Sequence, residues 1–377
     1  MCANPPIKHL VFRKLPPQIP NPKFHAPDGH FSLHSGAMNP AHIFSEGPIN
    51  SVVLSQDEDG NFTTSYQDTF SDPSFLGEGD VLIEVGWSSL NYKDAMALKG
   101  DKGVVRTVPL IPGIDVVGTV IESADPRFGR GDEVVLNGAG LGENRHGGFT
   151  QRLKVPSEPL LHIPFNFSAQ QVGALGTAGF TAALSVNALV DQGIKPEDGE
   201  ILVTGSTGGV GSIALHLLNK LGYTTVAVTG RREAHAEYLT SLGASDIIDR
   251  AELSEKGRPL QKGRWAGVVD SVGSHTLVNA IAQTKWGGIV TACGMAQGPD
   301  LPGTVLPFIL RGVHLVGINS VDAPRELRRR AWALLSEHLD TAVLDDMTTV
   351  IDVKDVAQAG EDLMAGKLHG RTAVRVH

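Results

Sequence analysis

A glycine-rich segment is the first stretch whose residue types and spacing could do chemistry. It reads Gly205-Ser-Thr-Gly208-Gly209-Val-Gly211 and directly follows the short apolar run 200–204. Such glycines allow a tight turn from a strand into a helix, let backbone N–H groups approach a pyrophosphate, and let the helix pack on the strand. Similar turns also occur without a ligand. Because a helical pattern over 209–221 follows this one, we favour a nucleotide-binding βαβ unit.

The residues that end the next apolar run, 224–229, indicate which nucleotide is bound. They read Thr229-Gly230-Arg231-Arg232. An NAD-binding fold usually carries an acidic residue here for the ribose 2′-hydroxyl, whereas arginine accommodates the 2′-phosphate of NADPH. We therefore expect NADPH. The alternative, that Arg231 and Arg232 are solvated surface charges, stays open at this point.

The composition restricts the class of protein. The 377 residues suffice for two domains, and 41% hydrophobic with 19% charged residues is typical of a soluble globular protein. The net charge of −9 argues against nucleic acid as the main partner. We expect no membrane-spanning segment, because no apolar run approaches about 18 to 20 residues. With only Cys2 and Cys293, a disulfide framework is excluded and a reducing, cytoplasmic location is expected.

Residues 1–48 differ in composition from the rest of the chain. Nine of the 22 prolines and five of the 14 histidines lie there, which predicts a disordered or loosely attached extension. His30 and His34 have the i, i+4 spacing of a helical metal site, but no third ligand is evident and we expect no metal. A transit peptide is a weaker alternative, because the prolines disrupt an amphipathic helix.

Two further regions must position the candidate residues. Short strands at regular spacing from 49 to about 164 predict a mainly β domain, in which Asn91 is the expected N-cap of a short helix that begins at Tyr92. Strands then alternate with helices to about 324, which predicts a doubly wound, parallel, Rossmann-type sheet and an α/β fold overall. The segments 357–364 and 371–376 are expected to return to the first domain.

Several segments resemble those of a known family. The most specific are NYKDA at 91–95 and PFILR at 307–311, and further ones are GTAGFTAAL at 176–184 and LHGRTAVRV at 368–376. The chain resembles the zinc-independent medium-chain dehydrogenases/reductases of the quinone-oxidoreductase type, and among them the acrylyl-CoA reductases. The resemblance covers nearly all of 49–376.

The resemblance implies a division into domains and a set of site residues. A GroES-like catalytic domain would comprise 49–170 and 325–377, with the Rossmann NADPH-binding domain, 171–324, inserted and the active site in a cleft between them. Tyr92 would lie beside the nicotinamide, and Arg231 with its neighbours at the 2′-phosphate. The full set of implied cofactor residues is Tyr92, Thr207, Gly208, Gly209, Val210, Thr229, Gly230, Arg231, Arg250, Met295, Ile309 and Ser320. The family usually has a single arginine where this chain has two, so which arginine contacts the phosphate stays open.

The implied reaction reduces the carbon–carbon double bond of acryloyl-CoA to propanoyl-CoA. Our hypothesis is that hydride reaches the β-carbon of the enoyl thioester, after which charge at the thioester oxygen is stabilised and the α-carbon is protonated. Tyr92 is expected to place the nicotinamide first and to relay a proton second, because a phenol is a weak acid at neutral pH. Arg106 could hold a substrate phosphate or the thioester oxygen, or form a structural ion pair instead.

Other candidate residues have simpler expected roles. Asp115 lies in an apolar stretch and is expected to be a satisfied structural carboxylate, and Cys293 a small buried thiol rather than a ligand or nucleophile. His146 lies in a glycine-rich loop without a ligand set, so no metal is expected. The alternatives for function are an NADPH:quinone or general enone reductase, or a non-enzymatic crystallin-like NADPH-binding protein. The family resemblance leads us to expect a homodimer.

Overall fold

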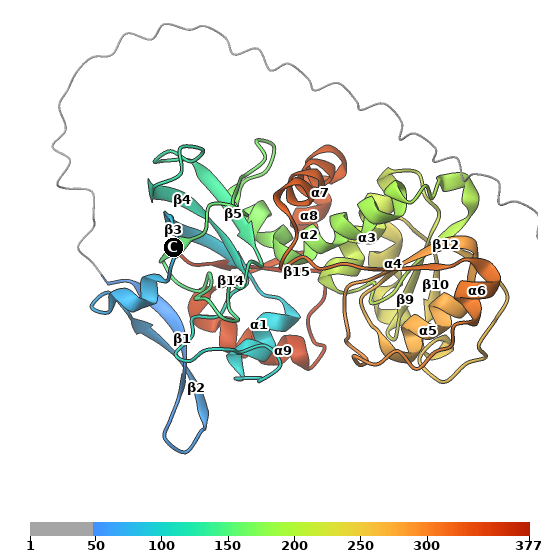
Figure 1. Cartoon of the computed structure of the whole chain (residues 1–377), viewed down its shortest axis with the longest axis horizontal. Coiled ribbons are helices and arrows are strands. Elements are labelled where there is room, and N and C mark those ends of the chain that lie inside the picture. Colours follow the sequence, from blue (N-terminus) through green and yellow to red (C-terminus); the bar gives the residue numbers. More distant parts are fainter. Residues whose placement is uncertain (1–47) are drawn as a thin grey trace, which may run out of the picture. The chain divides into compact units, whose positions relative to one another are not determined.

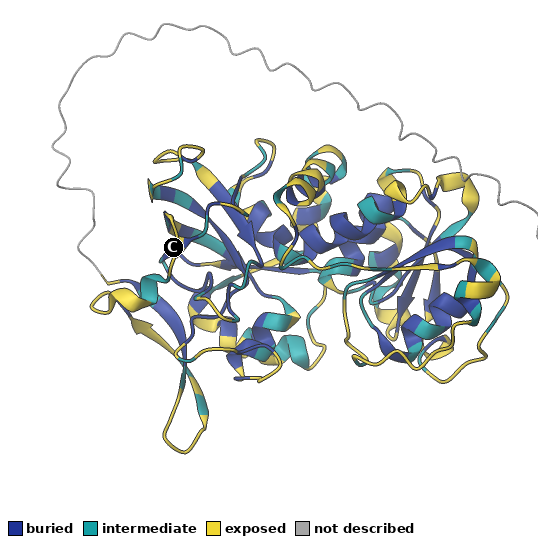
Figure 2. Ribbon diagram, in the orientation of Figure 1, coloured by how far each residue is buried: buried dark blue, intermediate teal, exposed yellow. Residues whose placement is uncertain are grey.

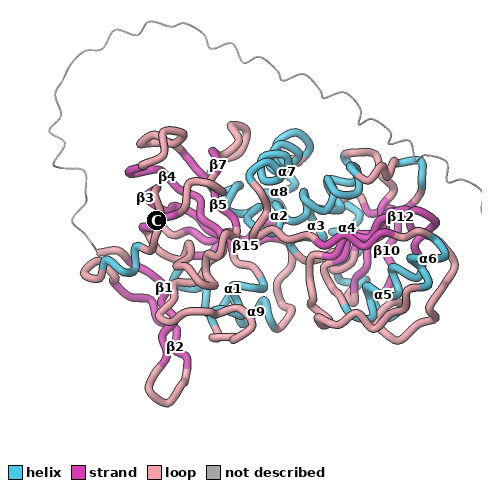
Figure 3. The backbone as a smooth tube through the Cα atoms, in the orientation of Figure 1, coloured by secondary structure: helices cyan, strands magenta, loops and turns pink. Residues whose placement is uncertain are grey.

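The computed structural model describes residues 48–377. The predicted extension and its His30 and His34 lie outside the described residues, except for residue 48. The described part contains a seven-stranded sheet, a six-stranded sheet and a two-stranded hairpin (Figures 1 and 3). Strands β1 (Asn50–Gln56) and β2 (Phe62–Asp68) form the antiparallel hairpin.

The seven-stranded sheet is built from both ends of the described chain. Its order is β14-β15-β3-β4-β5-β7, and β6 pairs with β3. The C-terminal strand β15 is antiparallel to β3 and parallel to β14, so the last residues rejoin the first sheet as the sequence predicts. Its strands are β3 (Val81–Ser89), β4 (Asp115–Ser123), β5 (Glu133–Asn137), β6 (Arg152–Val155), β7 (Leu161–His162), β14 (Thr348–Asp352) and β15 (Arg371–Arg375).

The six-stranded sheet has the order β10-β9-β8-β11-β12-β13, and all its strands are parallel. The first strand of this sheet in sequence, β8, is central. The next two, β9 and β10, extend the sheet to one edge, and β11, β12 and β13 extend it from β8 to the other edge. This is the doubly wound arrangement that the alternation of strands and helices predicts. Its strands are β8 (Glu200–Val203), β9 (Thr225–Thr229), β10 (Ala244–Asp249), β11 (Trp265–Asp270), β12 (Thr284–Ala292) and β13 (His314–Gly317).

Helices connect and cover these strands. In the parallel sheet an α-helix follows each strand except β10, which a short 3-10 helix follows, and α1 and α9 pack on each other beside the other sheet. The α-helices are α1 (Tyr92–Leu98), α2 (Ala169–Asp191), α3 (Gly209–Lys220), α4 (Arg232–Ser241), α5 (Ser274–Ala282), α6 (Leu306–Arg311), α7 (Arg325–His338), α8 (Thr341–Asp346) and α9 (Val356–Met364). Short 3-10 helices are Pro73–Leu76, Pro196–Asp198, Arg250–Glu252 and Val353–Asp355.

The central helix α2 is the longest of the described helices and touches elements of both large sheets (Figure 1). It is kinked at Gly176, whose φ of 46° is in the left-handed region. By length and composition it could cross a membrane, so our expectation that no apolar run is long enough was wrong. However, 83% of its most apolar window is buried inside the protein, and Figure 2 shows the helix mostly dark blue. Burial against two sheets explains the composition, because a helix that is apolar all round is typical of a core.

The fold class is confirmed, and the positions of most elements agree with the sequence pattern. The helix expected over 209–221 is α3, and the strand expected over 224–229 is β9. The pattern did not indicate β14 or the kink in α2. The boundaries of the two domains at 170 and 324 remain a prediction.

Candidate functional site

Most of the candidate cofactor residues follow the carboxyl ends of the parallel strands. Thr207 to Val210 follow β8, Thr229 to Arg231 end and follow β9, and Arg250 follows β10. Met295 follows β12 and Ser320 follows β13. Parallel strands end at one edge of a sheet, where ligands of doubly wound folds bind. Two candidates lie elsewhere, since Tyr92 begins α1 and Ile309 lies on α6, with exposed fractions of 49% and 68%.

Short contacts fix the glycine-rich turn between β8 and α3. Gly205 has a φ of 59°, which favours glycine, and a Cβ at Gly211 would lie 2.5 Å from the Gly205 carbonyl oxygen. The Ser206 hydroxyl donates to Val203 O at 2.6 Å and accepts from Val228 N at 2.9 Å. The turn therefore holds the N-terminus of α3, whose first residues carry unpaired N–H groups, at a fixed place.

Arginines gather where β9 and β10 end. The Arg231 amide donates to Thr229 Oγ1 at 3.1 Å, and its Nη1 donates to the carbonyl of Gly366 in the segment before β15. A Cβ at Gly230 would lie 2.5 Å from Arg250 Nε, so the Arg250 side chain rests on this glycine. Arg232 is the first residue of α4 and is exposed. The structure thus brings Arg231, Gly230 and Arg250 together.

Tyr92 takes its place from the start of α1. The backbone N–H of Asn91 donates to Asp94 Oδ2 at 2.8 Å, which stabilises the first turn of the helix. The next residue, Lys93, pairs with Glu143 at 2.7 Å, and the Glu143 carbonyl accepts from the Arg106 amide at 2.9 Å. Arg106 itself is exposed and donates to the carbonyls of Lys102 and Gly103, so its guanidinium supports a local turn.

Asp115 is the centre of a buried polar network, and its side chain is fully inaccessible. It accepts from Asn91 Nδ2 at 2.9 Å, from Asn137 Nδ2 at 2.7 Å and from the Ser89 hydroxyl. It also accepts from both the amide and the hydroxyl of Thr177, at 2.9 and 2.6 Å. The expectation of a satisfied structural carboxylate is confirmed. This carboxylate ties α1, β5 and α2 to one point.

The kink in α2 explains two of these contacts and reveals a residue that the sequence reasoning missed. A kink frees backbone groups from the helix, and here Asp115 accepts the Thr177 N–H while the Arg371 Nε donates to Ala174 O at 2.6 Å. Arg371, from β15, is buried, and a Cβ at Gly209 would overlap its Nη1. A guanidinium thus lies against the glycine-rich turn. The residue before it, Gly370, donates its amide to Thr207 O at 3.0 Å. The sequence signal for Arg371 was its place in the segment LHGRTAVRV, which carries the family resemblance.

Burial shifts the pKa values of two charged groups around this network, Asp94 and Arg371. Burial, together with the charge of Asp115, raises the pKa of Asp94 to about 7, although three N–H donors from Asn91 and Ile114 favour its charged form. Burial lowers the pKa of Arg371 to about 10, while the two carboxylates oppose that shift. Arg371 therefore stays charged at neutral pH and balances the carboxylates through Asn91, whose Oδ1 accepts from Arg371 Nη2 at 3.3 Å.

A second buried arginine extends the network to the loop that carries Ser320. Arg328 of α7 donates to Asn137 O at 2.6 Å and to Val321 O at 2.8 Å, and more weakly to Ser320 O at 3.3 Å. Burial lowers its pKa to about 10. Because Asn137 also bonds Asp115, the loop after β13, the start of α1 and the glycine-rich turn are joined by one set of buried contacts.

The remaining candidates have structural contacts. Cys293 is partly buried, its Sγ donates to Asp270 O at 3.2 Å, and burial raises the pKa of the thiol to about 12, as for an unreactive cysteine. His146 Nδ1 accepts from Ile111 N at 3.0 Å, and burial lowers the pKa of its imidazole. Among residues 48–377, no group of three or more His, Cys, Asp or Glu side chains could hold a metal ion.

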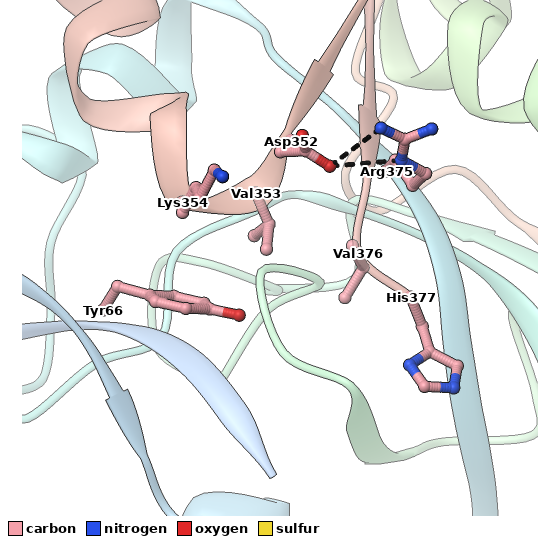
Figure 4. A pocket seen from close by; sticks show the side chains of 7 residues that line it. All are labelled: Tyr66, Asp352, Val353, Lys354, Arg375, Val376 and His377. Atoms are coloured by element: carbon pink, nitrogen blue, oxygen red, sulfur yellow. Dashed lines mark hydrogen bonds and ion pairs between the residues drawn. The ribbon is translucent and has the colours of Figure 1, made fainter.

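A cavity of about 160 Å³ lies apart from these residues. It is lined by Tyr66 of the hairpin and by residues 352–354 and 375–377, and Figure 4 shows the Asp352–Arg375 ion pair on its wall. None of its lining residues is a candidate site residue. The candidate site is therefore defined by converging strand ends and buried contacts rather than by this cavity.

Comparison with known proteins identifies the class of protein. A model of the alcohol dehydrogenase GroES-like domain matches residues 77–165, and a model described as zinc-binding dehydrogenase matches 209–337. The two sheets correspond to these two domains of the medium-chain dehydrogenases/reductases. The description of the second model names zinc, but the described part of this chain offers no such ligand set.

Individual relatives narrow the family. The probable acrylyl-CoA reductase AcuI of Escherichia coli is 47% identical over 86% of this chain and 99% of its own length. The yhdH oxidoreductase of Salmonella enterica, solved in complex with NADP, is 45% identical with a TM-score of 0.84, over 87% of this chain and all of that one. Bacillus subtilis yhfP, solved with NAD bound, is 39% identical with a TM-score of 0.82, over 87% and 99%. The chain belongs to the acrylyl-CoA reductase family of the medium-chain dehydrogenases/reductases.

Proposed function

We propose that this protein is an NADPH-dependent oxidoreductase that reduces the carbon–carbon double bond of acryloyl-CoA, or of a similar short enoyl thioester, to the saturated thioester. The observation that carries the proposal is that the segment 366–371 reaches both parts of the expected cofactor site: Gly366 accepts from Arg231, and Gly370 and Arg371 lie against the glycine-rich turn. The relatives named acrylyl-CoA reductase support the substrate class.

The residues present fit a phosphorylated dinucleotide. The buried Arg371 beside Gly209 offers positive charge to a pyrophosphate, together with the N-terminus of α3. Arg231 offers a guanidinium to the 2′-phosphate, and no acidic residue stands at the end of β9, where NAD-binding folds use one. NADPH, when bound, supplies the hydride for the reduction.

The protein's own part is to orient the substrate, to stabilise charge and to deliver a proton. Tyr92, half exposed at the start of α1, is the group we propose to place the nicotinamide and, second, to move a proton from its hydroxyl. Its backbone is held by Asn91 and Asp94, so the ring starts from a rigid element. We keep Arg106 as a candidate contact for a phosphate of the substrate, because it is exposed and its guanidinium donates to the backbone carbonyls of Lys102 and Gly103 in its own turn.

A quinone or general enone reductase is the second candidate. The relative yhfP is also named putative quinone oxidoreductase, and the 306 residues that align by sequence, as distinct from the structural alignment, are 44% identical to this chain, which supports the second candidate. The same cofactor residues would serve any activated double bond, so the cofactor site does not separate the two candidates. The non-enzymatic, crystallin-like reading predicts cofactor binding without turnover.

Initial rates of NADPH consumption separate these readings. We expect kcat/KM for acryloyl-CoA to exceed that for longer enoyl-CoA thioesters and for simple quinones by more than tenfold, as differential binding of the reacting group requires. Faster turnover with quinones would replace the proposed substrate class. Tight NADPH binding without turnover of any of these compounds would contradict both enzymatic functions.

We also propose a homodimer and a cytoplasmic location. Strand β13 is an edge of the parallel sheet, and Leu315 on it and Ile309 and Leu310 on α6 are exposed. An exposed apolar edge strand is a natural pairing surface for a second copy. Light scattering of the purified chain and of a Leu315→Lys variant tests this, because the charge should shift a dimer to monomer.

A further inference from the structure

Two histidines from distant parts of the chain meet beside Arg231. His235 lies four residues after it on α4, and His369 lies in the loop 365–370 between α9 and β15. Their ring centroids are 5.2 Å apart, and both rings also lie against Tyr238. The carbonyl of Gly366 in the same loop accepts from Arg231 Nη1. Loop 365–370 therefore closes on the end of β9 from the side of the other sheet.

The surroundings of the two rings are mainly positive. Burial and the charges of Arg231 and His369 lower the pKa of His235. Burial raises the pKa of Tyr238, and the positive charge of Arg371 on β15 opposes this shift. Lys367 in the loop is paired with Asp362 at 2.8 Å, and Arg232 and Glu233 begin α4 at the surface. An anion placed here would meet Arg231 and two imidazoles, and it would favour the protonated form of each imidazole.

We propose that His235 and His369 complete the binding site for the 2′-phosphate of NADPH together with Arg231. The inference rests on the proposed cofactor site and extends it, because one of the three residues of the phosphate site, His369, would come from loop 365–370 and not from the strand ends and helices of the parallel sheet. Each imidazole can donate a hydrogen bond to a phosphate oxygen, and Arg231 exchanges the Gly366 carbonyl for the phosphate.

A simple packing role for the histidines makes a different prediction. Stacked rings would fasten loop 365–370 to α4 whatever cofactor is bound. Their loss would then weaken NADPH and NADH by the same factor, since both cofactors share every group except the 2′-phosphate. Replacement by phenylalanine keeps an aromatic ring of similar size and removes only the donors and the charge, so it isolates the proposed contact.

The test measures dissociation constants of NADPH and NADH by nicotinamide fluorescence, without substrate, for the full chain. The variants are His235→Phe, His369→Phe and the double variant. His162→Phe is the matched control, because the His162 ring also lies against an aromatic ring, that of Phe128, but in the other sheet. Calorimetric binding of 2′,5′-ADP gives a second readout that involves no nicotinamide.

We expect each substitution to raise the dissociation constant of NADPH and of 2′,5′-ADP about tenfold, as for loss of a hydrogen bond to a charged group, and that of NADH less than twofold.

Equal changes for NADPH and NADH, or no change for either, would overturn the proposal. The result is separate from the proposed reaction. A protein with a histidine-dependent preference for NADPH that leaves acryloyl-CoA unreduced would contradict the proposed function alone.

Discussion

At the scale of single residues, the two arginines after β9 differ in their surroundings. Both are exposed, but Arg231 reaches loop 365–370 through Gly366, whereas Arg232 begins α4. The extra arginine in this chain therefore does not duplicate the first. We propose Arg231 as the contact for the 2′-phosphate.

Substitution of each arginine tests this assignment. We expect Arg231→Ala to weaken NADPH by about 10- to 100-fold and NADH little, because a hydrogen-bonded charge pair contributes about 1.5–3 kcal/mol. Arg232→Ala removes the same charge one residue later and is the control, with an expected change below about threefold. Dissociation constants of both cofactors check the prediction. An unchanged cofactor preference in both variants would remove the arginine argument.

Substitution of Tyr92 separates placement from proton transfer. If placement dominates, Tyr92→Phe lowers kcat about tenfold or less, and Tyr92→Ala lowers kcat/KM by clearly more. Steady-state kinetics with acryloyl-CoA measure both. Tyr66, on the hairpin and 45% exposed, gives the control variant Tyr66→Phe with no expected effect. A loss of more than about 100-fold in Tyr92→Phe would instead assign the proton to Tyr92.

Asp94 makes stability depend on pH in a defined direction. Its pKa is about 7 in the folded protein, raised by burial and by Asp115, against 3.8 for a free carboxyl. The folded state therefore binds the proton more tightly, and this group's contribution to the free energy of unfolding falls as pH rises from about 4 to about 7. Denaturant unfolding of the native protein and of Asp94→Asn should show their difference moving in favour of the variant over this window. A constant difference would contradict the assignment.

At the scale of elements, α2 is the connection between the two large sheets. Its kink at Gly176 exposes one amide and one carbonyl, which Asp115 and Arg371 bind. The first ligand comes from β4 and the second from β15, so the conformation of one helix couples the start of α1 to the glycine-rich turn. Two contacts of the polar network therefore exist because the kink frees these backbone groups from the helix.

Gly176 tests how far the fold depends on this kink. A Cβ there would overlap Ser89 Oγ and lie 2.6 Å from Asp115 Oδ2, and the residue also has a positive φ. We expect Gly176→Ala to lower the free energy of unfolding by about 3 kcal/mol. Gly193, just after α2, has a φ of 89° and open space around it, so Gly193→Ala should cost only about 1 kcal/mol. Equal losses in denaturant unfolding would mean that crowding at the kink is unimportant.

At the scale of the whole molecule, the spacing of apolar residues in the sequence predicted the architecture. The contacts between residues far apart in the sequence could not be predicted from that spacing. The parallel sheet is evident because most of its apolar runs alternate with helices of regular spacing, and the glycine-rich turn marks its first crossing. Arg371 and His369 could not be placed beside the cofactor residues, since they follow α9 in sequence and reach the glycine-rich turn and α4 only through the pairing of β15 with β3. The kink at Gly176 lies inside an uninterrupted apolar pattern, so nothing in the spacing indicated it.

The most direct measurement of the central claim follows the hydrogen itself. NADPH deuterated at the transferring position of the nicotinamide is mixed with acryloyl-CoA and the protein, and the product is analysed by mass spectrometry with fragmentation. The account predicts propanoyl-CoA with one deuterium at the β-carbon and a solvent hydrogen at the α-carbon. Unchanged acryloyl-CoA, or a saturated product without deuterium at the β-carbon, would contradict it.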